Sequence, residues 1–240
     1  MKVLVYGCNG ALGAAIVRCM RSKSAWSTVG VDVARSTAVH HSICVNPADA
    51  MFPSKSAPAV QRALEVALAD NADKKLDAII CVSGGFAMGD AAAPQLLQGV
   101  EDMFARSVFP SFVCAQLASI YLRKGGLLLL PGAAVGDNTP TPWGLSYGAS
   151  KGAVHHLVRS LAHPDSNLPQ DVKVVGIAPI TLDSDANRAA MPDADTSTWT
   201  PLSEVATTVC EWVENPSLCT SGVVYKVQTN SGKTFFVPME

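Results

Sequence analysis

The chain has 240 residues, of which 48% are hydrophobic and 16% are charged, and its formal net charge at pH 7 is −2. This length suits one large α/β domain, and the apolar content is sufficient for a sheet that is buried on both faces. No run of Lys and Arg is longer than two residues, which excludes the broad basic surface of a nucleic-acid-binding protein. No uninterrupted apolar stretch approaches the ~18 residues of a membrane helix, so we expect neither a nucleic acid nor a membrane as partner.

The first recognisable element is a strand over residues 2–6, which leads into the string Gly7-Cys8-Asn9-Gly10-Ala11-Leu12-Gly13 and a helix over residues 10–22. A glycine turn between a strand and a helix lets the backbone pack closely against a pyrophosphate at the helix N-terminus. The turn therefore predicts a dinucleotide site. The residues expected to bind the cofactor there are Gly7, Asn9, Gly10, Ala11, Leu12 and Gly13.

Asp32 follows the second predicted strand, residues 28–31. Asp32 stands nineteen residues after Gly13. In such sites the acid that binds the adenosine ribose hydroxyls lies ~20 residues after the glycine turn. Its carboxylate would repel a 2′-phosphate, so NADH is favoured as the cofactor and NADPH is disfavoured. Arg35 is a competing candidate for a phosphate clamp, although a solvated loop arginine is the simpler interpretation.

Strands and helices continue to alternate along the rest of the chain. Further strands are predicted at residues 42–45, 78–82, 127–130, 172–177, 223–227 and 234–237, and helices at residues 60–68, about 96–123, about 147–162 and 202–213. Pro110 should kink or interrupt the long third helix. Residues 179–200 have weak periodicity and are expected to form an irregular flap. The pattern predicts a single doubly wound Rossmann domain over residues 1–240, with a mostly parallel seven-stranded sheet.

Two further strings lie where the chemistry of such a domain is expected. Ser83, Gly84 and Gly85 end the fourth strand at the carboxyl edge, where ligands bind in open α/β sheets, so we expect them to contact the cofactor. Tyr147 and Lys151 are four residues apart, so both side chains leave the same face of a helix. The ammonium and a positive nicotinamide both favour the phenolate, which moves the phenol toward the useful range for acid catalysis.

The glycine turn and the Tyr147-x-x-x-Lys151 motif, in this order, make the chain resemble the short-chain dehydrogenase/reductase family along nearly its whole length. The resemblance implies that Tyr147 is the proton donor, and that Lys151 binds the nicotinamide ribose and lowers the pKa of Tyr147. Ile180 and Thr181 are also expected to contact the cofactor.

Departures from the family pattern point to one branch. The glycine spacing is Gly-x-x-Gly-x-x-Gly, and Ala133, Ala134 and Val135 stand where the family usually has a serine that binds a substrate carbonyl. The string over residues 187–201 is the most specific resemblance to the branch that reduces quinonoid dihydropterin with NADH. That substrate is therefore implied here, with Phe86 (tryptophan in those relatives) and Trp143 as expected substrate contacts. For Trp143 a loop anchor is an equal alternative.

Two other functions remain open from the residues. One is a short-chain reductase of another conjugated imine or carbonyl, and the other is a non-catalytic NAD(H)-binding redox sensor. The helices about 96–123 and 147–162 are apolar on several faces, and in the resembling family they form a dimer contact, so a homodimer is expected.

The seven cysteines are scattered through apolar segments and form no C-x-x-C pair. An odd number in that arrangement indicates reduced thiols, and we therefore expect a cytoplasmic protein. Neither His40-His41 nor His155-His156 has acidic or thiol companions at metal-ligand spacing, so no metal site is predicted and these histidines are expected to be structural or exposed.

Overall fold

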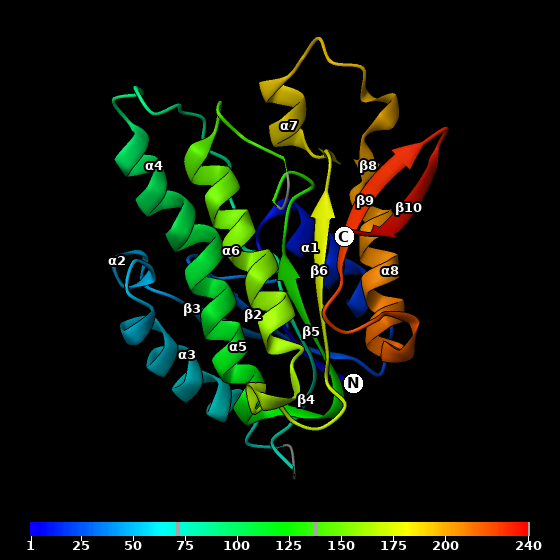
Figure 1. The fold of residues 1–240 in the computed structure, drawn as a ribbon. Helices are drawn as coiled ribbons and strands as arrows, with labels where there is room; N and C mark the ends of the chain where they lie inside the picture. The colour runs from blue at the N-terminus through cyan, green and yellow to red at the C-terminus, as the bar shows by residue number, and fades with distance from the viewer. Residues whose placement is uncertain (71–72, 137–138, 240) are drawn as a thin grey trace.

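The apolar runs of the chain form one central sheet in the computed structural model, which describes residues 1–70, 73–136 and 139–239 (Figure 1). Its strand order is β10-β9-β6-β5-β4-β1-β2-β3, and all neighbours pair in parallel except β9 and β10. This order reverses direction beside β1, as in doubly wound folds. The strands are β1 (Lys2–Tyr6), β2 (Ser27–Asp32), β3 (His41–Cys44), β4 (Leu76–Cys81), β5 (Leu122–Pro131), β6 (Lys173–Pro179), β9 (Val224–Asn230) and β10 (Lys233–Pro238).

The sheet has eight strands instead of the predicted seven, and its two C-terminal strands form a hairpin at one edge. Ser231 and Gly232 connect β9 to β10, and both have positive φ angles, 50° and 73°. Two successive left-handed residues give the tight turn whose twist matches a pair of antiparallel strands. β10 thereby becomes an antiparallel edge strand on an otherwise parallel sheet.

Helices cover both faces of the sheet and create two separate cores (Figure 1). One face is packed by α3 (Pro53–Ala67), α5 (Phe109–Tyr121) and α6 (Leu145–Leu161), and the other by α1 (Ala11–Arg21) and α8 (Leu202–Glu214). Alternating strand residues point to opposite faces: Val3 and Val5 lie in the core beneath α1 and α8, whereas Leu4 lies in the other. A sheet buried on both sides explains the high apolar content.

The long helical stretch is interrupted, as predicted, but the interruption starts before the proline. α4 (Leu96–Met103) is followed by a π-helical turn, η1 (Phe104–Val108), and then by α5. Pro110 has no N–H to donate to the carbonyl oxygen of Arg106 four residues earlier, and that oxygen instead accepts a hydrogen bond from Ser83 Oγ at 2.8 Å. By length and composition the run Leu96–Tyr121 could cross a membrane, but half of its most apolar window is buried inside the fold.

The expectation of an irregular flap over residues 179–200 is wrong, because the segment contains regular elements. β7 (Leu182–Asp183) and β8 (Thr200–Pro201) pair in parallel and form a two-stranded sheet. Between them lie α7 (Asp185–Ala190) and a 3₁₀ turn, η3 (Thr196–Thr198). Elements of two to six residues are too short to show a period, which is why the sequence pattern missed them. The remaining short elements are α2 (Pro47–Ala50), η2 (Pro164–Ser166) and η4 (Pro216–Leu218).

Candidate functional site

The glycine turn after β1 is packed so tightly that two of its glycines are required by the fold itself. Gly7 has a φ of +87°, and a Cβ on it would lie 2.6 Å from the backbone nitrogen of Ser83. A Cβ on Gly13 would lie 2.0 Å from the carbonyl oxygen of Gly7. A Cβ on Gly10 would meet only that same oxygen, at 3.4 Å. Gly10 therefore faces open space, which is where a phosphate would approach the start of α1.

Asp32 lies beside this turn and ties it to the end of β2. Its Oδ2 accepts a hydrogen bond from the backbone N–H of Asn9 at 2.9 Å, and its Oδ1 accepts one from the N–H of Val33 at 2.8 Å. Asn9 adds a bond from its Nδ2 to the carbonyl oxygen of Ala34 at 2.8 Å. Each carboxylate oxygen keeps a lone pair for a ligand. Asp32 thus combines a structural role with the geometry of a ribose acceptor.

A cavity of about 560 Å³ lies against the turn, within the usual size range of small-molecule sites. We call it the cofactor cavity. It is lined by Tyr6, Gly7, Gly10, Asp32, Val33, Val45, Pro47, Ala50, Met51, Ser56, Val82, Ser83, Gly84, Asp102, Ala105, Arg106, Phe109 and Pro110. The turn, the acid after β2 and the end of β4 therefore share one space, and the glycine that has room for a phosphate faces it. These residues fit a dinucleotide.

Tyr147 and Lys151 lie on α6, immediately beyond this cavity. Lys151 is almost fully buried, and its Nζ donates a hydrogen bond to the carbonyl oxygen of Pro131 at 3.1 Å. Burial lowers the pKa of the Lys151 ammonium to about 8, against a smaller opposing effect of the Cys81 thiol. Burial also raises the pKa of Tyr147 above its ordinary value. The ligand-free environment therefore keeps the phenol protonated, the opposite of the shift expected once a cationic cofactor is bound.

Gly84 lies between the Tyr147–Lys151 pair and the cavity. A Cβ on Gly84 would lie 3.4 Å from Lys151 Nζ and 3.8 Å from Ser107 Oγ. Ser107 is fully buried, and its hydroxyl has no hydrogen-bond partner among the described residues. Buried hydroxyls are normally paired. A polar ligand that passes Gly84 would meet unfilled hydrogen-bonding capacity on both Lys151 and Ser107.

Two aromatic side chains, Phe86 and Trp143, lie beside the proposed proton donor, Tyr147. The Phe86 ring is 5.0 Å from the Tyr147 ring in an edge-to-face arrangement and 5.9 Å from the Trp143 ring. Trp143 is 6.1 Å from Tyr147. Phe86 and Trp143 keep 61% and 39% of their surfaces exposed, so a flat molecule can reach both rings. The structure thus brings the two predicted substrate contacts to the predicted proton donor.

The loop after β5 offers this site no hydroxyl from Ala133, Ala134 or Val135. The backbone N–H of Ala133 donates to Nε2 of His155 at 3.2 Å, and the His155 ring packs closely against Gly132 and Gly136. His155 is fully buried. It was predicted as structural or exposed, and its position shows that it holds this loop in place from α6.

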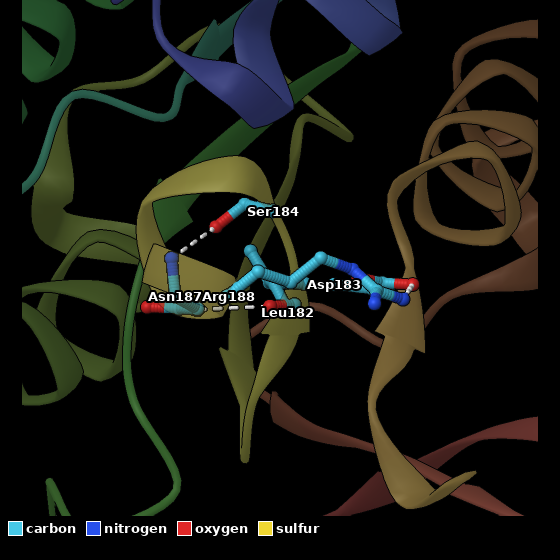
Figure 2. A network of polar contacts seen from close by, with 5 residues as sticks. All are labelled: Leu182, Asp183, Ser184, Asn187 and Arg188. Carbon is cyan, nitrogen blue, oxygen red and sulfur yellow. Dashed lines mark hydrogen bonds and ion pairs between the residues drawn. The ribbon is translucent and has the colours of Figure 1, made fainter. Parts of the chain in front are cut away.

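The flap, residues 179–200, contains hydrogen bonds and an ion pair between its own residues. Figure 2 shows the Arg188 side chain reaching the carboxylate of Asp183, with distances of 2.5 and 2.8 Å. Ser184 caps α7 by accepting from the N–H of Asn187 at 3.3 Å. The predicted cofactor contacts Ile180 and Thr181 lie at its start, where the Ile180 N–H donates to Val227 and the Thr181 carbonyl accepts from Thr200. Neither residue lines the cofactor cavity.

Sequence reasoning missed several residues that line the cavity from the α4–α5 region. These include Asp102, Arg106 and Phe109. A signal was present for one of them, because Arg106-Ser107 falls at the helix position where the resembling family usually has an asparagine. Asp102 and Phe109 are distant from the glycine turn in sequence and come close to it only in the folded chain, so no sequence signal marked them.

Comparisons with known proteins identify the family of the chain. The family described as short chain dehydrogenase matches residues 1–195. A dihydropteridine reductase from Dictyostelium discoideum is 34% identical over 234 residues, which cover 97% of this chain and 96% of that protein. Among solved structures, a short-chain dehydrogenase/reductase from Serratia marcescens has a TM-score of 0.77 at 21% identity, covering 97% of this chain and 98% of that one. BdcA in complex with NADPH has a TM-score of 0.72 at 21% identity, covering 100% and 95%.

The two structural matches establish the fold, and the family match with the near full-length relative establishes more. Together they confirm the resemblance inferred from the glycine turn and the Tyr147–Lys151 motif. The chain belongs to the short-chain dehydrogenase/reductase family of oxidoreductases.

Proposed function

We propose that this protein reduces quinonoid dihydropterin to tetrahydropterin with NADH. The similarity to the Dictyostelium dihydropteridine reductase over nearly the whole chain supports this substrate. The observation that carries the proposal is a missing donor. Ala133, Ala134 and Val135 supply no hydroxyl for a substrate carbonyl, and the Ala133 N–H is already bound to His155. Without such a donor a ketone typically loses ~10²–10³-fold in rate.

A quinonoid dihydropterin does not depend on a hydroxyl at that position. Its ring is electron-poor, and the proton that completes the reduction goes to a ring nitrogen. The ring can lie against Phe86, with Trp143 at its side, so that its nitrogen comes within reach of the Tyr147 hydroxyl. A dinucleotide held in the cofactor cavity would supply the hydride.

The roles of the catalytic pair follow from its surroundings. Tyr147 gives its phenolic proton to the substrate nitrogen, and burial keeps that proton in place until it is needed. Lys151 is cationic at neutral pH, because its pKa of about 8 lies above 7. One of its N–H groups is bound to Pro131, which leaves two to bind ribose hydroxyls and to stabilise the phenolate.

The preference for NADH rests on Asp32. Its two oxygens are fixed by the N–H groups of Asn9 and Val33, so the carboxylate cannot rotate away from a 2′-phosphate without breaking these bonds. BdcA was solved with NADPH, which makes the preference of the present chain a matter for direct measurement.

The apolar surface of α4 and α5 supports a homodimer through these helices and α6. Leu97, Val100, Phe112 and Ile120 are exposed there. The seven free cysteines support a location in the reducing cytoplasm.

The experiment that tests the function follows NADH oxidation with freshly generated quinonoid dihydropterin, beside a panel of ketones and aldehydes. We expect turnover with the pterin at a kcat/KM at least 10²-fold above that of any carbonyl in the panel. The Tyr147→Phe variant serves as the control for uncatalysed reduction. Efficient reduction of a ketone without pterin turnover would refute the proposal, and binding of NADH without any turnover would favour a sensor.

A further inference from the structure

Among the described residues that line the cofactor cavity, Arg106 is the one positively charged side chain. The other charged lining residues are Asp32 and Asp102, both negative. A dinucleotide brings two negative charges on its diphosphate. Without Arg106 these charges would enter a cavity whose formal charges are all of the same sign. The first turn of α1 contains no acidic residue, but the helix terminus supplies only a partial positive charge.

The Arg106 guanidinium has no ion-pair partner among the described residues. Asp102 instead accepts a hydrogen bond from Gln98 at 3.3 Å. The side chain runs along Gly85, where a Cβ would lie 3.0 Å from Arg106 Cδ and 3.8 Å from Nη1. Because Gly85 has no side chain, the Arg106 side chain can pack against its backbone.

The backbone of Arg106 is anchored to the end of β4. Because Pro110 has no N–H to donate to it, the carbonyl oxygen of Arg106 accepts a hydrogen bond from Ser83 Oγ instead. The residue also lies in the π-helical turn η1, a distortion that is often found at functional sites. These features hold an exposed, uncompensated arginine at the wall of the cofactor cavity.

From this placement we infer that Arg106 binds the diphosphate of the dinucleotide cofactor. Its planar guanidinium matches phosphate oxygens in a two-pronged arrangement. Strand order favours the diphosphate over a 2′-phosphate. Arg106 lies against the end of β4, the glycine turn follows the adjacent β1, and Asp32 ends β2 on the far side of β1. Two strand spacings, about 10 Å, separate the ends of β4 and β2. The inference rests on the dinucleotide site of the proposed function but not on its substrate.

Calorimetric titrations with NADH, NADPH, ADP-ribose and adenosine test the inference on the wild type and on three variants. Arg106→Gln removes the charge, Arg106→Lys keeps it without the planar fork, and Arg62→Gln removes an exposed arginine of α3 that does not line the cavity. We expect Arg106→Gln to weaken NADH and ADP-ribose binding about tenfold and to leave adenosine binding unchanged. Arg106→Lys should lie between the two, and Arg62→Gln should bind like the wild type.

The salt dependence of binding gives an independent readout. The affinity of the wild type for ADP-ribose should fall more steeply with ionic strength than that of Arg106→Gln, since one fewer ionic contact is screened in the variant. Equal ADP-ribose affinity in the wild type and Arg106→Gln would overturn the inference. A loss confined to NADPH, or an equal loss for adenosine, would also overturn it. Failure of the wild type to bind either NADH or NADPH would instead refute the proposed function.

Discussion

The Nζ of Lys151 lies 5.9 Å from the centroid of the Tyr147 ring, one helical turn away on α6. The Lys151 Nζ donates a hydrogen bond to the Pro131 carbonyl oxygen at the end of β5, and Tyr147 is flanked by Phe86 and Trp143. A fixed cation and a phenol enclosed by rings are thus presented together to the space beyond Gly84. In the proposed function this arrangement would separate two tasks, because the hydroxyl would meet the substrate while the ammonium would meet the cofactor.

Replacing Tyr147 by Phe should remove the proton donor with little effect on packing. The ring remains available for its contacts with Phe86 and Trp143. We expect kcat with quinonoid dihydropterin to fall ~10²–10⁴-fold, whereas the Kd for NADH changes less than twofold. Steady-state kinetics and a fluorescence titration measure the two quantities. A variant that keeps a third of the wild-type kcat would show that Tyr147 is not the donor.

Replacing Lys151 by Met should stabilise the ligand-free protein at neutral pH. Burial lowers the folded-state pKa of Lys151 to about 8, below the ordinary 10.5 of an unfolded chain. Below pH 8 both states carry the charge, and the folded state bears the full cost of burying it. Between pH 8 and 10.5 the unfolded state binds more protons, so wild-type stability gains with rising pH and the cost disappears.

Urea unfolding of both proteins from pH 7 to 10.5 measures this effect. We expect Lys151→Met to exceed the wild type by on the order of 3 kcal/mol at pH 7, less the lost hydrogen bond to Pro131. The difference should shrink as the pH rises. The same variant should show weaker NADH binding and little turnover. A stability difference that does not vary with pH would contradict a depressed pKa of Lys151.

The parts of the fold that the sequence predicted are those determined by neighbouring residues. Gly13 is required by a contact within one turn, with the carbonyl oxygen of Gly7, and Tyr147 and Lys151 share a face because of helical spacing alone. The doubly wound sheet follows from the alternation of apolar runs and helical stripes. The glycine turn and the Tyr147–Lys151 motif can each be recognised in a short stretch of sequence, and the alternation of strands and helices can be followed along the chain. All three could therefore be found without coordinates.

The features that escaped prediction depend on contacts between distant segments. Arg106 belongs to the cofactor cavity because Pro110 leaves its carbonyl oxygen to Ser83, 23 positions earlier. His155 was treated as a member of a His-His pair, but its partner is the Ala133 N–H on another element. The flap has regular structure because β7 meets β8 across the intervening helix. No local pattern encodes such pairings.

Changing Asp32 to Asn should narrow the preference for NADH over NADPH. The amide keeps an oxygen to accept from Asn9 or Val33 but removes the charge that opposes a 2′-phosphate. We expect the ratio of kcat/KM values for the two cofactors to shift by about tenfold or more, in line with 1–3 kcal/mol for an unfavourable charge contact. Asp32→Ser should shift it in the same direction and also lower Tm, because the turn loses both bonds. A wild type that uses NADPH better than NADH would show that Asp32 does not select the cofactor.

Introducing a charge at Phe112 should dissociate the proposed homodimer. This ring lies on α5 and keeps 52% of its surface exposed although it is large and apolar. Burying a carboxylate in a subunit contact without a partner is costly, so Phe112→Glu should convert the protein to a monomer at micromolar concentration. Val66→Glu is the matched control, since Val66 is 77% exposed on α3, outside the proposed contact. Light scattering coupled to size exclusion measures both masses. A wild-type monomer, or a Phe112→Glu variant with the mass of a dimer, would place the subunit contact elsewhere or exclude it.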